Sequence, residues 1–222
     1  MRITLIFLAI LLGISLTWLV RQSVNVRPWV AEAPGPGMQD RLPARVTAAR
    51  LGLVVFLAVV TSLFMLSTSA YFMRMELGRD WIPLSVPPLL WVNTVILVAA
   101  SLALQRAWNA ARRLELDKVR APLVAGAACT VVFVLGQAVA WWQLHSGGQH
   151  LGINPATSFF YFMTALHALH LLGGLAAWVR TLRRLGRGDS PQRIRVSVEL
   201  CTVYWHFLLV LWLGILGLLI TT

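Results

Sequence analysis

Six long apolar runs constrain the fold of this chain more than any other feature of its sequence. A run of about 17 to 25 apolar residues can cross the hydrocarbon core of a bilayer as a helix. Such runs lie at Ile3–Val20, Leu51–Phe72, Pro88–Leu104, Ala121–Trp142, Phe159–Val179 and Val198–Ile220. Only 12% of the residues are charged, about half the share in soluble domains. The sequence therefore predicts an all-α, polytopic transmembrane helix bundle with six spans.

The basic residues are distributed unevenly between the loops that join these runs. Sixteen of the 19 lysines and arginines follow the first, third and fifth runs. By the positive-inside rule these loops face the cytoplasm, so both termini are expected outside. The loops account for most of the net charge of +11, and we expect no nucleic-acid partner. The expected localisation is the bacterial inner (plasma) membrane, as a multi-pass protein.

A proline- and glycine-rich stretch separates the first apolar run from the other five. Four prolines and two glycines fall within residues 28–43, and they prevent a regular helix there. The first run lacks a small-residue cleavage site, so we interpret it as an uncleaved anchor. We therefore expect a transmembrane anchor with a cytoplasmic linker over residues 1–50, and a five-helix bundle over residues 51–222.

Polar side chains inside the fifth run are candidate functional residues, because a polar group at membrane depth is costly. Thr164, His167, His170 and Gly174 are spaced three or four residues apart. This spacing places them on one stripe of a helix. A small residue in such a stripe lets a neighbouring helix approach, and polar residues can then form hydrogen bonds across the contact.

The sixth run begins beside Glu199, and His206 lies two helical turns beyond it. Because the fifth and sixth runs are antiparallel, His170 and His206 are expected at one depth, where they can meet. Three interpretations stay open: a hydrogen-bonded polar seam between helices, the axial ligands of one b-type haem, or part of a proton route. Metal binding by His167, His170 and Glu199 has less support, because Glu199 lies about four turns from His167 in depth.

The remaining histidines and both cysteines indicate no site. His145 and His150 lie in a loop on the outer side and are interpreted as solvated. Cys129 and Cys201 match neither a metal-ligand spacing nor a disulfide framework. We interpret them as small buried apolar residues.

Two segments of the last two runs resemble the signature segments of the haem–copper oxidase (cytochrome c oxidase) subunit III family. In "TALHALHLLGG" the matching residues are Thr164, His167, His170 and Gly174. In "ELCTVYWHF" they are Glu199, Tyr204, Trp205 and His206. Ala165 and Ala168 replace two glycines of the family pattern. The resemblance extends from about Leu51 to Ile220, and the first apolar run has no counterpart in it.

The resemblance implies a divergent bacterial member of the family: a non-catalytic accessory subunit of a respiratory haem–copper terminal oxidase. Such a subunit stabilises the catalytic subunit, binds phospholipid in a cleft between helices and supports proton uptake during oxygen reduction. It has no catalytic, cofactor-binding or metal-binding residues, and its motif residues are structural or contact lipid. Haem and copper are expected in its partners, which are catalytic subunit I, subunit II and small subunits.

Two alternatives to this function stay open. One is a subunit III-like accessory protein of a nitric oxide reductase, and the other is a one-haem b-type membrane cytochrome. Three positions also depart from the family, which carries buried carboxylates where this chain has Val60, Ala140 and Leu209. Support for proton uptake must then come from other residues.

A lipid headgroup site is expected at the start of the sixth run. Arg193 and Arg195 lie just before Val198, and a basic cluster beside a membrane span attracts anionic headgroups. The alternative is that these arginines only set the topology of the chain.

Overall fold

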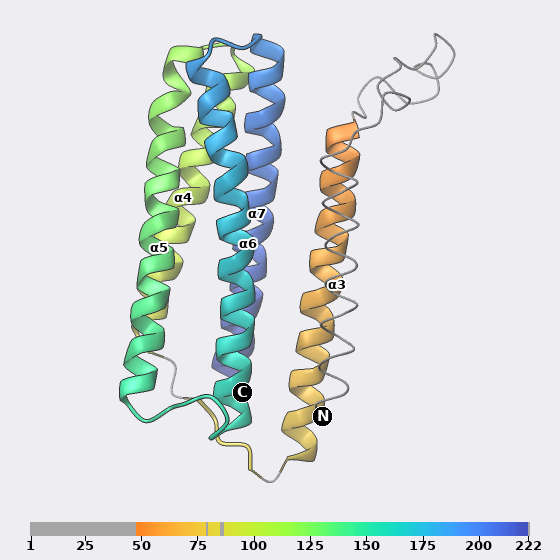
Figure 1. The fold of residues 1–222 in the computed structure, drawn as a ribbon, viewed down its shortest axis with the longest axis vertical. Coiled ribbons are helices and arrows are strands. Elements are labelled where there is room, and N and C mark those ends of the chain that lie inside the picture. The colour runs from red at the N-terminus through yellow and green to blue at the C-terminus, as the bar shows by residue number, and fades with distance from the viewer. Residues whose placement is uncertain (1–47, 79, 85–86, 222) are drawn as a thin grey trace, which may run out of the picture. The chain divides into compact units, whose positions relative to one another are not determined.

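The structure is a computed structural model that describes residues 48–78, 80–84 and 87–221 (Figure 1). Over these residues it contains five long helices and one 3-10 helix, and no strand. The elements are α3 (Ala48–Leu77), α4 (Leu89–Arg112), η2 (Leu116–Lys118), α5 (Arg120–Ser146), α6 (Pro155–Gly186) and α7 (Pro191–Thr221). All five long helices are long and apolar enough to cross a membrane. The all-helical, multi-span class is therefore confirmed.

Part of the predicted topology falls outside the described residues. The first predicted span, the linker that follows it and both chain ends lie there. The sixth span, the outward position of both termini and the division of the chain at residue 50 therefore stay predictions.

Each of the five helices is longer than the apolar run that predicted it, because turn chemistry rather than hydropathy sets the ends. α6 shows this at its start, where the side chain of Asn154 accepts a hydrogen bond from the backbone N–H of Ala156 at 3.1 Å. Pro155 occupies the first helical position, where its missing N–H costs nothing. α6 ends just before Gly188, whose φ of 69° no other residue type adopts readily.

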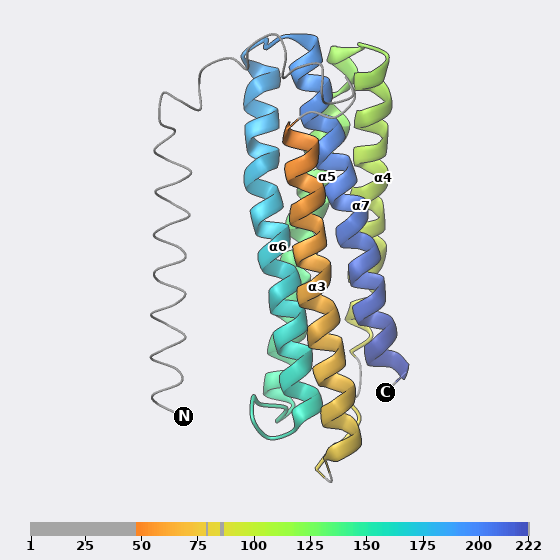
Figure 2. The ribbon, with the colours of Figure 1, turned by 90° about the vertical axis from the view of Figure 1, so that its right-hand side faces the viewer.

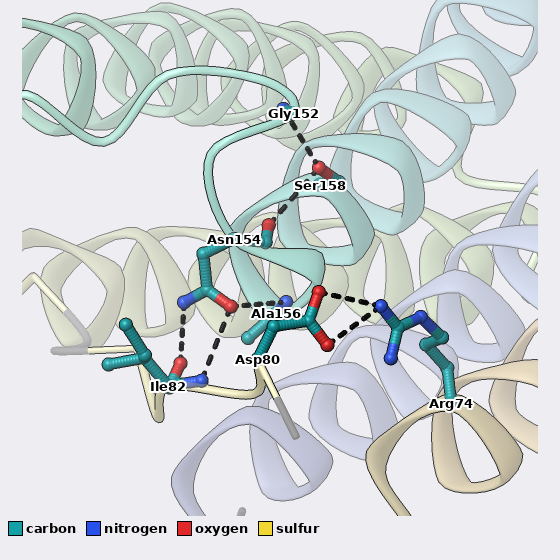
Figure 3. Close-up of polar contacts among 7 residues, drawn as sticks. All are labelled: Arg74, Asp80, Ile82, Gly152, Asn154, Ala156 and Ser158. Atoms are coloured by element: carbon teal, nitrogen blue, oxygen red, sulfur yellow. Dashed lines mark hydrogen bonds and ion pairs between the residues drawn. The ribbon is translucent and has the colours of Figure 1, made fainter. Parts of the chain in front are cut away.

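Asn154 also fixes the start of α6 to the segment that follows α3 (Figure 3). Its Nδ2 donates to the carbonyl of Ile82 at 2.6 Å, and its Oδ1 accepts from the N–H of Ile82 at 3.3 Å. Nearby, Arg74 donates to both carboxylate oxygens of Asp80 at 2.8 Å. These bonds hold the pKa of the Asp80 carboxyl below its usual value of 3.8. The loop after α3 is thereby held against the bundle.

Helices α4, α5, α6 and α7 form a four-helix group in which each helix packs against two neighbours (Figures 1 and 2). The group encloses large side chains that are almost completely buried. They are Trp178, Trp205, Trp212, Phe133 and Phe160.

α3 is attached to this group differently, through a few long side chains. It lies beside α6 and α7 in both views (Figures 1 and 2). The ring of Phe64 lies 5.8 Å from that of His170, and the ring of Phe56 lies 6.0 Å from that of Tyr204. On the other side of α3, large apolar side chains such as Val54 are exposed. Because large side chains hold α3 at a distance, space is left between the helices.

Candidate functional site

A cleft of about 560 Å³ lies between α3 and the pair α6–α7. Almost all of its lining is apolar, and four of the family-motif residues lie in it. They are His170, Gly174, Tyr204 and Trp205. Four of the eight motif residues thus line one cleft, and their contact with lipid stays a prediction.

Gly174 makes the close contact between α6 and α7 that forms the floor of the cleft. A Cβ atom at this position would lie 2.6 Å from a ring carbon of Tyr204 and 2.8 Å from ring carbons of Trp205. One turn away, the hydroxyl of Tyr204 donates to the backbone carbonyl of His170 at 2.9 Å. The two motif segments therefore contact each other directly.

His170 contributes its ring to the attachment of α3. Its Nδ1 donates to the carbonyl of Leu166 at 2.7 Å, within the same helix. The ring lies 6.3 Å from that of Phe56 and 5.8 Å from that of Phe64, both on α3. His170 therefore acts as a packing residue in this contact.

The predicted pairing of His170 with His206 is wrong. Nδ1 of His206 donates to the carbonyl of Thr202 at 2.7 Å, and no hydrogen bond or ring contact joins the two histidines. His206 follows Tyr204 by two residues, which is about 200° around a helix. Because Tyr204 faces α6, His206 is turned away from it. Sequence analysis matched the depth of the two histidines and overlooked the direction of their side chains.

His167 lies in a different environment from His170. It is completely buried inside the four-helix group, between the rings of Phe133 at 5.8 Å and Trp212 at 5.2 Å. Neither of its ring nitrogens has a hydrogen-bond partner. The arrangement supports a packing role for His167.

Threonine–tryptophan hydrogen bonds join the helices at three places that sequence analysis missed. Trp205 Nε1 donates to Thr130 Oγ1 at 3.0 Å, and Trp212 Nε1 donates to Thr94 Oγ1 at 2.9 Å. In the same way, Trp141 Nε1 donates to Thr164 Oγ1 at 3.0 Å. Each bond satisfies an indole N–H at membrane depth. The available signal was a single threonine inside each of three apolar runs.

Glu199 binds α3 and does not approach His167. Its Oε2 lies 2.7 Å from the guanidinium of Arg50, one helical turn from the cleft residue Leu53. Among the described residues, no group of three or more His, Cys, Asp or Glu side chains is placed to hold a metal ion. The alternative metal site of His167, His170 and Glu199 is therefore not formed.

Arg193 and Arg195, the two arginines predicted to bind a lipid headgroup, differ in their contacts. The guanidinium of Arg195 lies 5.9 Å from the ring centroid of Trp108, and that of Arg112 lies 5.8 Å from the same ring. Arg193 is exposed. Two arginines thus contact one indole at the end of the bundle, and headgroup binding there stays a prediction.

The three positions that lack a family carboxylate differ in burial. Val60 is 2% exposed and Ala140 is completely buried, whereas Leu209 is half-buried. No ionisable group occupies these positions, so they provide no proton-carrying side chain.

Comparison with known proteins shows similarity over almost the whole chain. The family model described as "Cytochrome c oxidase subunit III" matches residues 4–220. This match includes the first apolar run, which the residue-level resemblance had left without a counterpart.

Individual relatives have the same description. A probable cytochrome c oxidase subunit 3 of Mycobacterium bovis is 30% identical over 176 residues, which are 77% of this chain and 86% of the relative. A cytochrome c oxidase subunit 3 of Synechocystis sp. is 28% identical over 167 residues, or 73% of this chain and 70% of the relative. The protein of the same name from Thermostichus vulcanus is 29% identical over 173 residues, which are 76% of this chain and 85% of the relative.

Proposed function

The chain belongs to the cytochrome c oxidase subunit III family, and we propose that it acts as a lipid-holding accessory subunit of a haem–copper oxidase. The cleft between α3 and α6–α7 is the single observation that carries this proposal. Its lining is apolar, and the motif residues Gly174 and Tyr204 belong to it.

Phospholipid acyl chains are the ligand that this lining suits. The few polar atoms at the wall, such as the hydroxyl of Tyr204 and Nδ1 of His170, are already bound to backbone carbonyls. A ligand in the cleft therefore meets mainly apolar surface, which favours hydrocarbon. Lipid held there fills the space beside α3 and stabilises its attachment.

The proposed support for proton uptake does not use a buried carboxylate. Val60, Ala140 and Leu209 cannot carry protons, and Glu199 is held by Arg50. We propose instead that the subunit shields and orders the proton entrance of the catalytic subunit. The arginine-rich end of the bundle, which includes Arg195, attracts anionic lipid to the same side.

The proposed partners are catalytic subunit I, subunit II and small subunits, with haem and copper in those partners, in a bacterial inner membrane. The names of the relatives favour an oxidase over a nitric oxide reductase. The one-haem cytochrome loses its main support, because His170 lines the cleft and His206 does not.

Two glycines allow a matched test of the proposal in the purified oxidase. Gly173 lines the cleft, and a Cβ there meets nothing within 4 Å, so Gly173→Leu fills the cleft without disturbing the helices. We expect fewer bound phospholipids per complex and faster inactivation during turnover. Gly217→Leu, also in open space but outside the cleft, is the control and should change neither quantity. Unchanged lipid content and lifetime with Gly173→Leu contradict the proposal.

A further inference from the structure

A second hollow, of about 630 Å³, lies between α4 and α5 where η2 joins them. This α4–α5 pocket lies where α4 ends and α5 begins, a connection that is uppermost in Figure 1. None of its lining residues lines the cleft beside α3. Its lining combines small side chains with a cluster of charged and polar ones. The charged and polar residues are Arg106, Asn109, Arg113, Glu115 and Lys118.

The pocket has an excess of positive charge. Glu115 and Lys118 form an ion pair with 3.1 Å between Oε2 and Nζ. Within the described part of the chain, neither Arg106 nor Arg113 has an ion pair. Two arginine charges are therefore left uncompensated on one wall.

Both arginines are accessible to a ligand. Arg106 precedes Arg113 by seven residues, which is about 10 Å along α4, and both side chains are exposed. An anionic group at the end of the bundle can therefore reach both guanidinium groups. The lining itself supplies no free anion, because its one acid, Glu115, is bound to Lys118.

The shape of the pocket suits a lipid headgroup at the membrane surface. Ala110, Ala121 and Ala125 leave room between the two helices and form an apolar floor. Beside them, the end of α4 turns through Leu114, whose φ of 62° is in the left-handed region that normally takes glycine. Such strain is typical of functional turns. Here it leaves a large apolar side chain exposed next to the pocket.

We propose that the α4–α5 pocket binds the headgroup of an anionic phospholipid. Arg106 and Arg113 contact the phosphate, and the alanine floor contacts the glycerol and the first acyl carbons. Basic pockets between transmembrane helices commonly bind such headgroups. The excess of two positive charges matches the two phosphates of a cardiolipin-type lipid. This site shares no residue with the cleft and does not depend on lipid binding there.

The test measures cardiolipin binding to the complete oxidase in phosphatidylcholine nanodiscs, by native mass spectrometry. We expect Arg106→Gln/Arg113→Gln to weaken binding roughly 30-fold, because each arginine near the surface contributes about fivefold. Arg183→Gln/Arg187→Gln removes the same charge from exposed positions of α6 and the turn after it. This control should leave the affinity of the α4–α5 pocket unchanged.

Two further measurements complete the test. The first applies even if the variant Arg106→Gln/Arg113→Gln does not assemble, and the second identifies the anion. Glu115→Gln removes the only acid from the pocket and should strengthen cardiolipin binding about fivefold. Inorganic phosphate, added to the delipidated complex, should bind far more weakly than the lipid. An unaffected double variant, an equal loss in the control, no gain with Glu115→Gln, or phosphate binding as tight as lipid binding would each overturn the proposal.

Discussion

The guanidinium of Arg50 lies 2.7 Å from a carboxylate oxygen of Glu199, and this ion pair joins α3 to α7. Both side chains are partly buried, with 34% and 22% of their surface exposed. α3 also contacts the helices beside the cleft through aromatic rings, such as that of Phe64 with His170. The ion pair adds a directional contact one helical turn from the cleft residue Leu53.

Removing either charge should loosen α3. We expect Arg50→Gln and Glu199→Gln each to lower the unfolding temperature of the complex, with a coupling energy of about 1 kcal/mol in a double-mutant cycle. Exchanging the charges, with Arg50→Glu and Glu199→Arg together, should restore part of the loss. Arg74→Gln removes the more exposed pair with Asp80 and should have a smaller effect. Purely additive single variants would show that the pair contributes nothing.

Two adjacent glycines should respond very differently to one methyl group. Gly174→Ala places a Cβ within 2.8 Å of the rings of Tyr204 and Trp205, so α6 and α7 must separate. We expect a loss of about 1–3 kcal/mol in the free energy of unfolding. Gly173→Ala meets nothing within 4 Å and should be close to neutral. Chemical denaturation in detergent compares the two variants. Equal stability would mean that the close contact of α6 with α7 does not require glycine at position 174.

The bond from Trp205 to Thr130 should contribute measurably to the stability of the four-helix group. Thr130→Val keeps the shape of the side chain but leaves the indole N–H of Trp205 without its acceptor. A buried donor without a partner costs about 1–3 kcal/mol. Thr130→Ser retains the hydroxyl and should lose less, apart from the missing methyl group. The ranking of Val below Ser in thermal melts checks the prediction, and the reverse order contradicts it.

The number and order of the five described helices could be predicted from the sequence, because long apolar runs have few alternatives in a bilayer. The ends of the helices were harder to predict from the sequence. α6 continues from Phe159 back to Pro155 because Asn154 caps it, and hydropathy does not register a cap. The family motifs predicted the contact of α6 with α7, which Gly174 and Tyr204 form.

Partners between helices were harder to predict than the helices themselves. Depth along a helix follows directly from residue count, whereas the direction of a side chain depends on how the helix is rotated. Depth therefore matched His206 with His170, although Tyr204 is the residue that reaches α6. The pairing of Glu199 with Arg50 was missed for another reason: Arg50 lies outside the apolar run and was counted only as a loop charge.

The replacement of a family carboxylate by Val60 leads to a prediction about chemical labelling. Val60 is 2% exposed on α3, and no Asp or Glu lies between Leu51 and Phe72. Hydrophobic carbodiimides modify a neutral carboxyl group in apolar surroundings. We therefore expect no label in this segment of the wild-type subunit, as judged by mass spectrometry of its peptides. A modified peptide from this segment would contradict the expectation that it carries no reactive carboxyl group.

Val60→Glu tests whether a carboxyl group at this position is enough to support proton uptake. The introduced group has apolar surroundings and should stay neutral, because an unpaired charge is costly to bury. It should react with carbodiimide, yet turnover and proton pumping of the assembled oxidase should not rise, because Ala140 and Leu209 provide no further proton carrier. Removing the whole subunit should still speed inactivation during turnover, since shielding the catalytic subunit needs no carboxylate. Increased pumping in Val60→Glu, or an oxidase that is indifferent to loss of the subunit, would show that proton support depends on a carboxylate after all.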